Sequence, residues 1–182
     1  TEAAKERGEI EGLPKTKKDE IIHTIALAAL KFHIIKVSPK KRMVFDPKES
    51  VDLQGQTGPY IQNAYVRIRS VLRKAEIEKL EIGNWKLAGT YEQLETQEKA
   101  LVQQLHGFPN LIISAANEYD PSQVANYCYD LAKAFHKFYT DYSILKADTE
   151  EAKAFRLALS AAIANVLRTG MGLLGIEMPE RM

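Results

Sequence analysis

The chain of 182 residues has the composition of an ordinary globular domain, with 45% hydrophobic and 27% charged residues. This balance excludes disordered and fibrous classes, and the length is enough to bury one sizeable core without disulfides. The 25 basic and 24 acidic residues leave a formal net charge of only +1, so any binding of a polyanion must be local.

No run approaches the roughly 18 apolar residues of a membrane helix, and the charged start is unlike a signal peptide. These two features predict a cytoplasmic protein without a membrane contact. The chain begins without Met and inside a helical pattern, so we expect it to be part of a longer protein.

The first strong pattern runs from Lys17 to Lys36, where apolar residues recur at steps of three and four. It predicts an amphipathic helix with Asp19 and Glu20 in its first turn. The apolar positions are Ile21, Ile22, Ile25, Ala28, Ala29, Phe32 and Ile35. Residues 39–57 are polar and contain two prolines, so they predict a long connection of the kind that is usually functional or contacts another domain.

The rest of the chain predicts a helical bundle that begins at about residue 56. Its expected helices cover 59–80, 90–105, a short 111–119 after a break at Gly107-Phe108-Pro109, and 121–142. Thr149 is expected to cap a last helix, which frays through Gly170, Gly172 and Gly175. No alternating strand pattern and no internal repeat occurs. The prediction is an all-α fold, with residues 1–52 as a linker segment and residues 53–182 as a helical domain.

The helix expected from Pro59 carries an unusual distribution of charge. At 100° per residue one side is apolar, and this core stripe consists of Ile61, Ala64, Tyr65, Ile68, Val71, Leu72 and Ala75. Beside it lie Tyr60, Asn63, Arg67, Ser70 and Lys74, while Arg69 and Arg73 occupy the opposite flank. No acidic residue occurs between Asp52 and Glu76, so four positive charges have no local partner. An aromatic ring, an amide and a guanidinium in one row are what unstacked RNA bases require.

Other interpretations of the same face remain open. It is equally typical of a solvated basic helix, or of a scaffold that docks an acidic helix of a partner protein. On the helix 121–142, Leu131, Phe135, Phe138 and Tyr142 share a face that predicts core packing, which leaves Tyr139 as the candidate exposed stacking ring.

The sequence offers no complete catalytic or metal site. The four histidines have no metal-ligand spacing, and the one cysteine, Cys128, falls in a helical pattern that predicts a small buried core residue. Glycine-rich nucleotide loops and the nucleophile-elbow motif are missing from the sequence. We therefore expect no catalytic residue, no bound metal and no bound cofactor in this chain.

One long segment resembles the arginyl-tRNA synthetase family at the entry to its C-terminal domain. Residues 52–73 read Asp-Leu-Gln-Gly-Gln-Thr-Gly-Pro-Tyr-Ile-Gln-Asn-Ala-Tyr-Val-Arg-Ile-Arg-Ser-Val-Leu-Arg. Residues 39–47 before this segment and residues 170–182 after it agree with the same family in order and spacing. Asp130-Leu131-Ala132-Lys133 resembles the Asp-Ala-Leu-Arg motif of the family's anticodon-binding helix, with lysine in place of arginine, which keeps the charge and loses bidentate geometry.

The resemblance implies the C-terminal part of a class I arginine tRNA ligase. The parent enzyme would use ATP in a catalytic domain that is absent from this chain and would be its partner in cis, and the chain alone would be an inactive monomer that binds tRNA(Arg) through the anticodon stem and loop. The tRNA-binding positions implied by the resemblance or by the basic face are Tyr60, Asn63, Arg67, Lys74, Tyr139 and Met182. Relatives often have an aromatic residue at position 63, so a hydrogen-bonding role is expected for Asn63.

Overall fold

The computed structural model describes residues 12–43, 55–78 and 94–182, and these parts of the chain are helical without a strand. The helices are α2 (Lys15–Ile35), α4 (Gly58–Ile77), α5 (Thr96–Asn117), α6 (Ser122–Asp141) and α7 (Glu150–Leu173). The all-α prediction is confirmed. The expected boundary between residues 52 and 53 lies outside the described residues.

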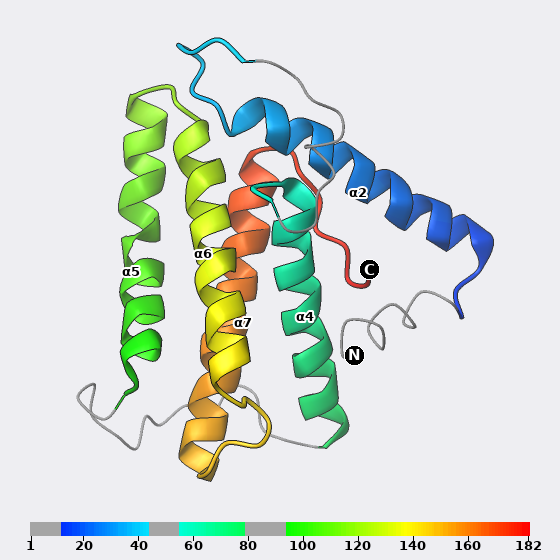
Figure 1. The fold of residues 1–182 in the computed structure, drawn as a ribbon, viewed down its shortest axis with the longest axis vertical. Helices are drawn as coiled ribbons and strands as arrows, with labels where there is room; N and C mark the ends of the chain where they lie inside the picture. The colour runs from blue at the N-terminus through cyan, green and yellow to red at the C-terminus, as the bar shows by residue number, and fades with distance from the viewer. Residues whose placement is uncertain (1–11, 44–54, 79–93) are drawn as a thin grey trace.

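Four of the helices form an upright bundle, and α2 crosses one end of it (Figure 1). Within the bundle α6 packs against α4, α5 and α7, and α7 also packs against α4 and α5. The first helix, α2, packs on α4 and makes a smaller contact with α6. Among the described helices, none has the combination of length and apolar character that a bilayer crossing demands.

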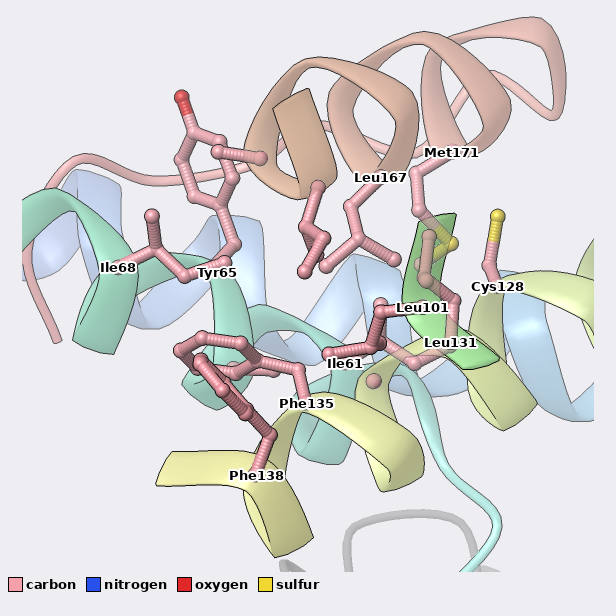
Figure 2. Close-up of a cluster of buried hydrophobic side chains, with 14 of the residues drawn as sticks. Ile61, Tyr65, Ile68, Leu101, Cys128, Leu131, Phe135, Phe138, Leu167 and Met171 are labelled. Carbon is pink, nitrogen blue, oxygen red and sulfur yellow. The ribbon is translucent and has the colours of Figure 1, made fainter. Parts of the chain in front are cut away.

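The core forms where the apolar stripe of α4 meets α6 and α7. All seven predicted stripe residues are buried, from Ile61 at one end to Ala75 at the other. In Figure 2, three residues of this stripe, Ile61, Tyr65 and Ile68, lie in one buried cluster with side chains of α6 and α7. Those side chains are Leu131, Phe135 and Phe138 of α6, with Leu167 and Met171 of α7. Cys128 is also buried, as predicted, and burial raises the pKa of its thiol to about 12, so it stays protonated at neutral pH.

The predicted break at residues 107–109 is wrong, because α5 continues from Thr96 to Asn117 with Pro109 inside it. A proline removes one main-chain hydrogen bond and normally ends or kinks a helix. Here α6 supports the same stretch, since the Tyr127 hydroxyl donates to the Gln104 carbonyl at 2.8 Å and the Tyr127 and Phe108 rings lie 5.3 Å apart. Packing between helices therefore keeps this segment helical where local sequence favours a break.

The predicted fraying of the last helix is also wrong. Thr149 does cap α7 as expected, accepting from the Ala152 N–H at 3.1 Å, but the helix continues through Gly170 to Leu173. It then ends sharply at Gly175, whose φ of +67° is in the left-handed region that glycine adopts without strain. The Ile176 N–H donates to the Met171 carbonyl at 2.9 Å, which is the bond pattern of a Schellman cap.

Gly170 does not weaken the end of α7 but allows this helix to pack closely against α6. A Cβ at this position would lie 2.6 Å from the Cys128 sulfur, so the glycine allows α7 to approach α6 closely. We expect Gly170→Ala to lower the free energy of unfolding by about 1–3 kcal/mol through overpacking. Urea denaturation followed by circular dichroism measures this change. Gly172→Ala is the matched control, because a Cβ there meets nothing within 4 Å.

The control should be neutral or stabilising by about 0.5–1 kcal/mol, the usual gain of alanine over glycine inside a helix. Adding Cys128→Ala to Gly170→Ala removes the sulfur and should restore part of the loss. Equal stability of the Gly170→Ala variant and the wild type would contradict the close approach of α6 and α7.

The first helix begins two residues earlier than predicted, at Lys15 after Pro14, so Asp19 and Glu20 lie beyond its first turn. Its inner face is buried as expected at Ala28 and Phe32, but Ile22 is 63% exposed, contrary to the predicted apolar face. The inner face lies very close to α4, because a Cβ on Gly58 would overlap the Ala28 carbonyl oxygen.

Candidate nucleic-acid interface

The start of α4 fixes the first residue of the candidate interface. Thr57 precedes the helix in an extended conformation, and its hydroxyl accepts from the Tyr60 N–H at 3.3 Å. Pro59 follows in the first turn, where a missing N–H costs nothing. The cap and the proline therefore begin the helix at Gly58 and set the direction in which the Tyr60 side chain leaves it.

Five side chains of α4 and α6 meet at the surface between these helices, and we call them the ring cluster. They are Tyr60 and Arg67 of α4, with Tyr129, His136 and Tyr139 of α6. The Tyr60 ring lies 5.3 Å from the Tyr129 ring and 4.9 Å from the His136 ring, which it meets edge-on. All five side chains are partly exposed. The cluster thus offers aromatic surface to solvent on a helical scaffold.

Arg67 lies between two rings of α6. Its guanidinium carbon is 5.0 Å from the centre of the Tyr139 ring, and its Nη1 is 3.3 Å from Nδ1 of His136. The first contact is a cation–π interaction, which orients a guanidinium without neutralising its charge. None of the five side chains of the ring cluster is acidic, so within the cluster Arg67 brings a positive charge beside the aromatic rings.

His136 supports Arg67 because it is neutral. Burial and then the nearby Arg67 charge lower the pKa of His136 to about 4, although a hydrogen bond with the Tyr60 main chain opposes the shift. A neutral imidazole has one acceptor nitrogen, and the contact assigns that role to Nδ1, which accepts from the Arg67 guanidinium. Burial also raises the pKa of Tyr60, so its phenol remains protonated at neutral pH.

The low pKa of His136 predicts a pH dependence of stability. Between its ordinary value near 6.5 and its folded value near 4, the unfolded chain binds a proton that the folded chain does not. The free energy of unfolding should therefore fall as the pH drops through this window. In a His136→Gln variant the fall should be less steep, measured by urea denaturation at a series of pH values. Parallel profiles for the variant and the wild type would contradict a neutral His136.

Two further predicted residues lie on the same flank of α4 as Tyr60 and Arg67. Asn63 is partly buried and lies about one turn from each of them, and Lys74 is exposed in the last turn. At 1.5 Å per residue the flank from Tyr60 to Lys74 is about 21 Å long. The flank therefore continues the ring cluster along α4 with an amide and a second positive charge.

The expectation that Arg69 carries an uncompensated charge is wrong, and Arg73 also has a hydrogen-bond partner in the C-terminal tail. Glu180 of the C-terminal tail accepts from Arg69 Nε at 2.7 Å and from the Tyr65 hydroxyl at 2.9 Å, and its main-chain carbonyl accepts from Arg73 at 3.0 Å. Partial burial opposes ionisation of Glu180, but the hydrogen bonds from Arg69 and Tyr65 outweigh it and lower its pKa. This acid is more than a hundred residues away in the sequence, so the local pattern gave no indication of it.

The same tail carries the predicted Met182. Two contacts fix the tail to α4. Glu180 of the tail accepts from Arg69, and Gln62 of α4 donates to the Glu177 carbonyl at 2.8 Å. Arg69 lies about 160° around the helix from Arg67, counted at 100° per residue, so the anchored part of the tail lies on the opposite flank of α4. The structure therefore brings Tyr60, Arg67 and Tyr139 together, and anchors the tail that ends in Met182 on the other side of α4.

Sequence reasoning missed Tyr129 and His136 as members of the interface. They are seven residues apart on α6, a spacing that places two side chains on one helix face, and Tyr139 follows His136 by one turn. This spacing is the sequence signal that predicts a shared face for Tyr129, His136 and Tyr139. The motif 130–133 lies beside them, with Leu131 and Ala132 buried in the core and Asp130 and Lys133 exposed.

Comparison with known proteins identifies the family of the chain. The family model of the DALR anticodon binding domain matches residues 61–182. An arginine–tRNA ligase of Bacteroides fragilis is 47% identical over 181 residues, which cover 100% of this chain and 30% of that protein. An arginine–tRNA ligase of Porphyromonas gingivalis is 42% identical, again over 100% of this chain and 30% of that protein. The chain thus spans about 30% of the length of the curated relatives that it matches.

Solved structures give the same result. Arginyl-tRNA synthetase of Thermus thermophilus superposes with a TM-score of 0.81 at 34% identity, over 96% of this chain and 29% of that one. The enzyme of Plasmodium falciparum has a TM-score of 0.73 at 23% identity, over 90% of this chain and 28% of that one, and shows the shared fold. With the family model matching α6, α7 and nearly all of α4, the chain belongs to the DALR anticodon binding domain family.

Proposed function

We propose that this chain is the module with which an arginine tRNA ligase binds the anticodon stem and loop of tRNA(Arg). The observation that carries the proposal is the ring cluster, which combines partly exposed aromatic rings with a guanidinium held by Tyr139 and His136. The family match and the relatives named arginine–tRNA ligase support it. The remaining length of the parent protein would supply ATP-dependent attachment of arginine.

The chemistry of the cluster suits unstacked RNA bases. Such bases are recognised by stacking on aromatic rings and by hydrogen bonds to their edges, while phosphates pair with positive charges. Tyr60 and Tyr139 supply stacking rings, and Asn63 and Arg67 supply hydrogen-bonding groups. Lys74, at the far end of the flank, suits a backbone phosphate. Binding at this site would orient the tRNA so that its distant acceptor end reaches the active site of the parent enzyme.

A competition experiment tests the proposal. A labelled anticodon stem-loop of tRNA(Arg) should bind the chain, and unlabelled tRNA(Arg) should displace it. A tRNA(Arg) with an altered anticodon should compete poorly, because the bases that the cluster reads have changed. Equal competition by both tRNAs would mean that the chain does not read the anticodon. No binding at all would favour the alternative interpretation of the basic face as a docking surface for an acidic protein.

The dependence of affinity on salt should be modest. Each phosphate neutralised on single-stranded RNA contributes a slope of about −0.7 in log K against log salt. Glu180 already pairs with Arg69, so the positive groups of the interface are few, chiefly Arg67 and Lys74. We therefore expect a slope near that of one or two phosphate contacts, about −0.7 to −1.4, in filter-binding titrations at several salt concentrations. A steep slope would indicate an extended basic surface elsewhere.

A further inference from the structure

The C-terminal tail places an acidic side chain against the flank of α4 that lies opposite to the ring cluster. The carboxylate of Glu180 accepts from Arg69 Nε at 2.7 Å and from the Tyr65 hydroxyl at 2.9 Å. The tail reaches this flank because the chain turns at Gly175, directly after α7, and then runs back along α4 (Figure 1). An acid from the end of the chain is thereby added to a flank that carries arginines.

This flank borders a groove of about 400 Å³ between α4 and α7. Arg69 of α4, Arg168 of α7 and one acid, Glu76 of α4, line the groove. Arg73 lies about 40° around α4 from Arg69, counted at 100° per residue, so it belongs to the same flank. We call Arg69, Arg73 and Arg168 the tail-side arginines. Glu76 alone leaves a surplus of positive charge among these side chains, and the carboxylate of Glu180 reduces it.

The negative charge of Glu180 is not required to hold the tail in place. Gln62 donates to the Glu177 carbonyl at 2.8 Å, and Arg73 donates to the main-chain carbonyl of Glu180 at 3.0 Å. Both contacts use main-chain oxygens of the tail. The ion pair is open to solvent, with the Arg69 side chain 37% and the Glu180 side chain 57% exposed, and such pairs add little to stability. The anchoring of the tail therefore does not explain why its side chain is acidic.

A strongly basic flank opposite to the ring cluster would lower the specificity of the RNA site. Positive side chains attract RNA phosphates whatever the base sequence. Arg69 and Arg67 are about 160° apart around α4, so RNA held by the tail-side arginines would lie on the side of the helix away from the rings. Specificity is a difference between two affinities, and it rises when binding of the wrong partner is weakened.

We propose that Glu180 is a specificity-determining residue, whose carboxylate partly neutralises the tail-side arginines and so weakens binding of RNA with the wrong anticodon. The inference rests on the proposed function, in which the ring cluster on the other flank binds the anticodon loop. Neutralisation lowers the affinity for the phosphates that all RNAs share and leaves the contacts of the ring cluster unchanged. Discrimination between tRNA(Arg) and other RNAs is then larger than the ring cluster alone provides.

Glu180→Gln tests this effect, because the amide keeps the size of the side chain and its ability to accept from Tyr65 but removes the charge. The tRNA(Arg) anticodon stem-loop and a stem-loop of the same length with only uridine in its loop are titrated separately. We expect the variant to bind the uridine loop several-fold more tightly than the wild type does, with a smaller relative change for the tRNA(Arg) stem-loop. The slope of log K against log salt for the uridine loop should become steeper by about −0.7, the value of one more phosphate contact.

Glu177→Gln is the matched control. It removes the same charge from the same tail, but the Glu177 side chain is exposed, and its main-chain carbonyl is the group that accepts from Gln62. This variant should bind both RNAs like the wild type. An equal gain for the uridine loop in Glu177→Gln and Glu180→Gln would assign the effect to net charge and would overturn the proposal.

The double variant Arg69→Gln/Glu180→Gln shows whether the effect passes through the ion pair. Removing the arginine that the carboxylate neutralises should abolish most of the gain for the uridine loop. A gain that persists undiminished would overturn the proposal. Circular dichroism checks the fold of each variant, and a Glu180→Gln chain that does not fold would show that the charge anchors the tail, which would overturn it as well.

The two proposals fail in different ways. A wild-type chain that does not bind the tRNA(Arg) stem-loop would contradict the proposed function. A wild-type chain that binds this stem-loop, together with a Glu180→Gln variant whose affinity for the uridine loop is unchanged, would contradict only the role of Glu180.

Discussion

Replacing Arg67 with alanine is expected to weaken binding of the tRNA(Arg) anticodon stem-loop by about 1–3 kcal/mol, which is roughly 5- to 150-fold in the dissociation constant. The guanidinium is held over Tyr139 and beside the acceptor nitrogen of a neutral His136, so it is oriented before RNA arrives. An oriented donor loses little side-chain entropy on binding, which makes its removal costly. Filter-binding or fluorescence titration with a labelled stem-loop measures the effect.

Two controls separate the geometry of Arg67 from its charge and from charge elsewhere. Arg67→Lys keeps the charge and loses the planar fork, so its affinity should lie between those of the wild type and the alanine variant. Arg168→Ala removes an exposed arginine of α7, which lies in a groove with Tyr65 and Arg69 and not in the ring cluster. This second variant should bind like the wild type. An equal loss in Arg67→Ala and Arg168→Ala would mean that only bulk charge matters.

The largest effect on stability is expected for Glu98→Ala, at about 3–5 kcal/mol. Glu98 has a side chain only 5% exposed, and it forms an ion pair of 2.7 Å with Arg156 of α7, whose side chain is 12% exposed. Removing the carboxylate would leave a nearly buried guanidinium without its anionic partner. The same carboxylate also accepts from the Glu95 N–H at 2.9 Å in a capping box, so the start of α5 loses a cap as well. Urea denaturation measures the change in the free energy of unfolding.

Glu150→Ala is the matched control for Glu98→Ala. Glu150 also pairs at 2.7 Å with a basic residue, Lys153, but its side chain is 78% exposed. Ion pairs at the protein surface contribute about 0–1 kcal/mol to stability, so Glu150→Ala should change the free energy of unfolding little. The double variant Glu98→Ala/Arg156→Ala should lose less than the sum of the two single variants, because the unpaired charge is gone. Strict additivity would show that the two side chains do not interact in solution.

The α5 helix shows why local sequence alone does not predict every helix of the fold. Gly107 and Pro109 are the residues that usually end helices, and the prediction of a break followed from them. The deciding contacts, from Tyr127 to Gln104 and to Phe108, join residues 19 and more positions apart. Interactions at that separation are set by how α5 and α6 pack, and a local pattern does not contain them.

The candidate site also combines features that the helical period predicts with contacts that it does not predict. Periodicity placed Tyr60, Asn63, Arg67 and Lys74 on one flank of α4, because the helical period alone determines which residues share a face. It did not indicate that His136 would accept from Arg67, since that contact requires α6 to lie beside α4 in one register. Nor did it indicate Glu180, whose carboxylate pairs with Arg69 from the far end of the chain.

The sequence by itself determined the all-α class, the buried stripe of α4, the capping of α7 by Thr149 and the basic flank on which the RNA site is proposed. These features depend on helical period and on side chains within one or two turns of each other. Only the tertiary structure decided which positive charges are already paired, which rings surround Arg67 and which glycines allow close helix packing. Those properties arise between helices that are distant in the chain, where distance and burial are fixed by the packing of the whole bundle.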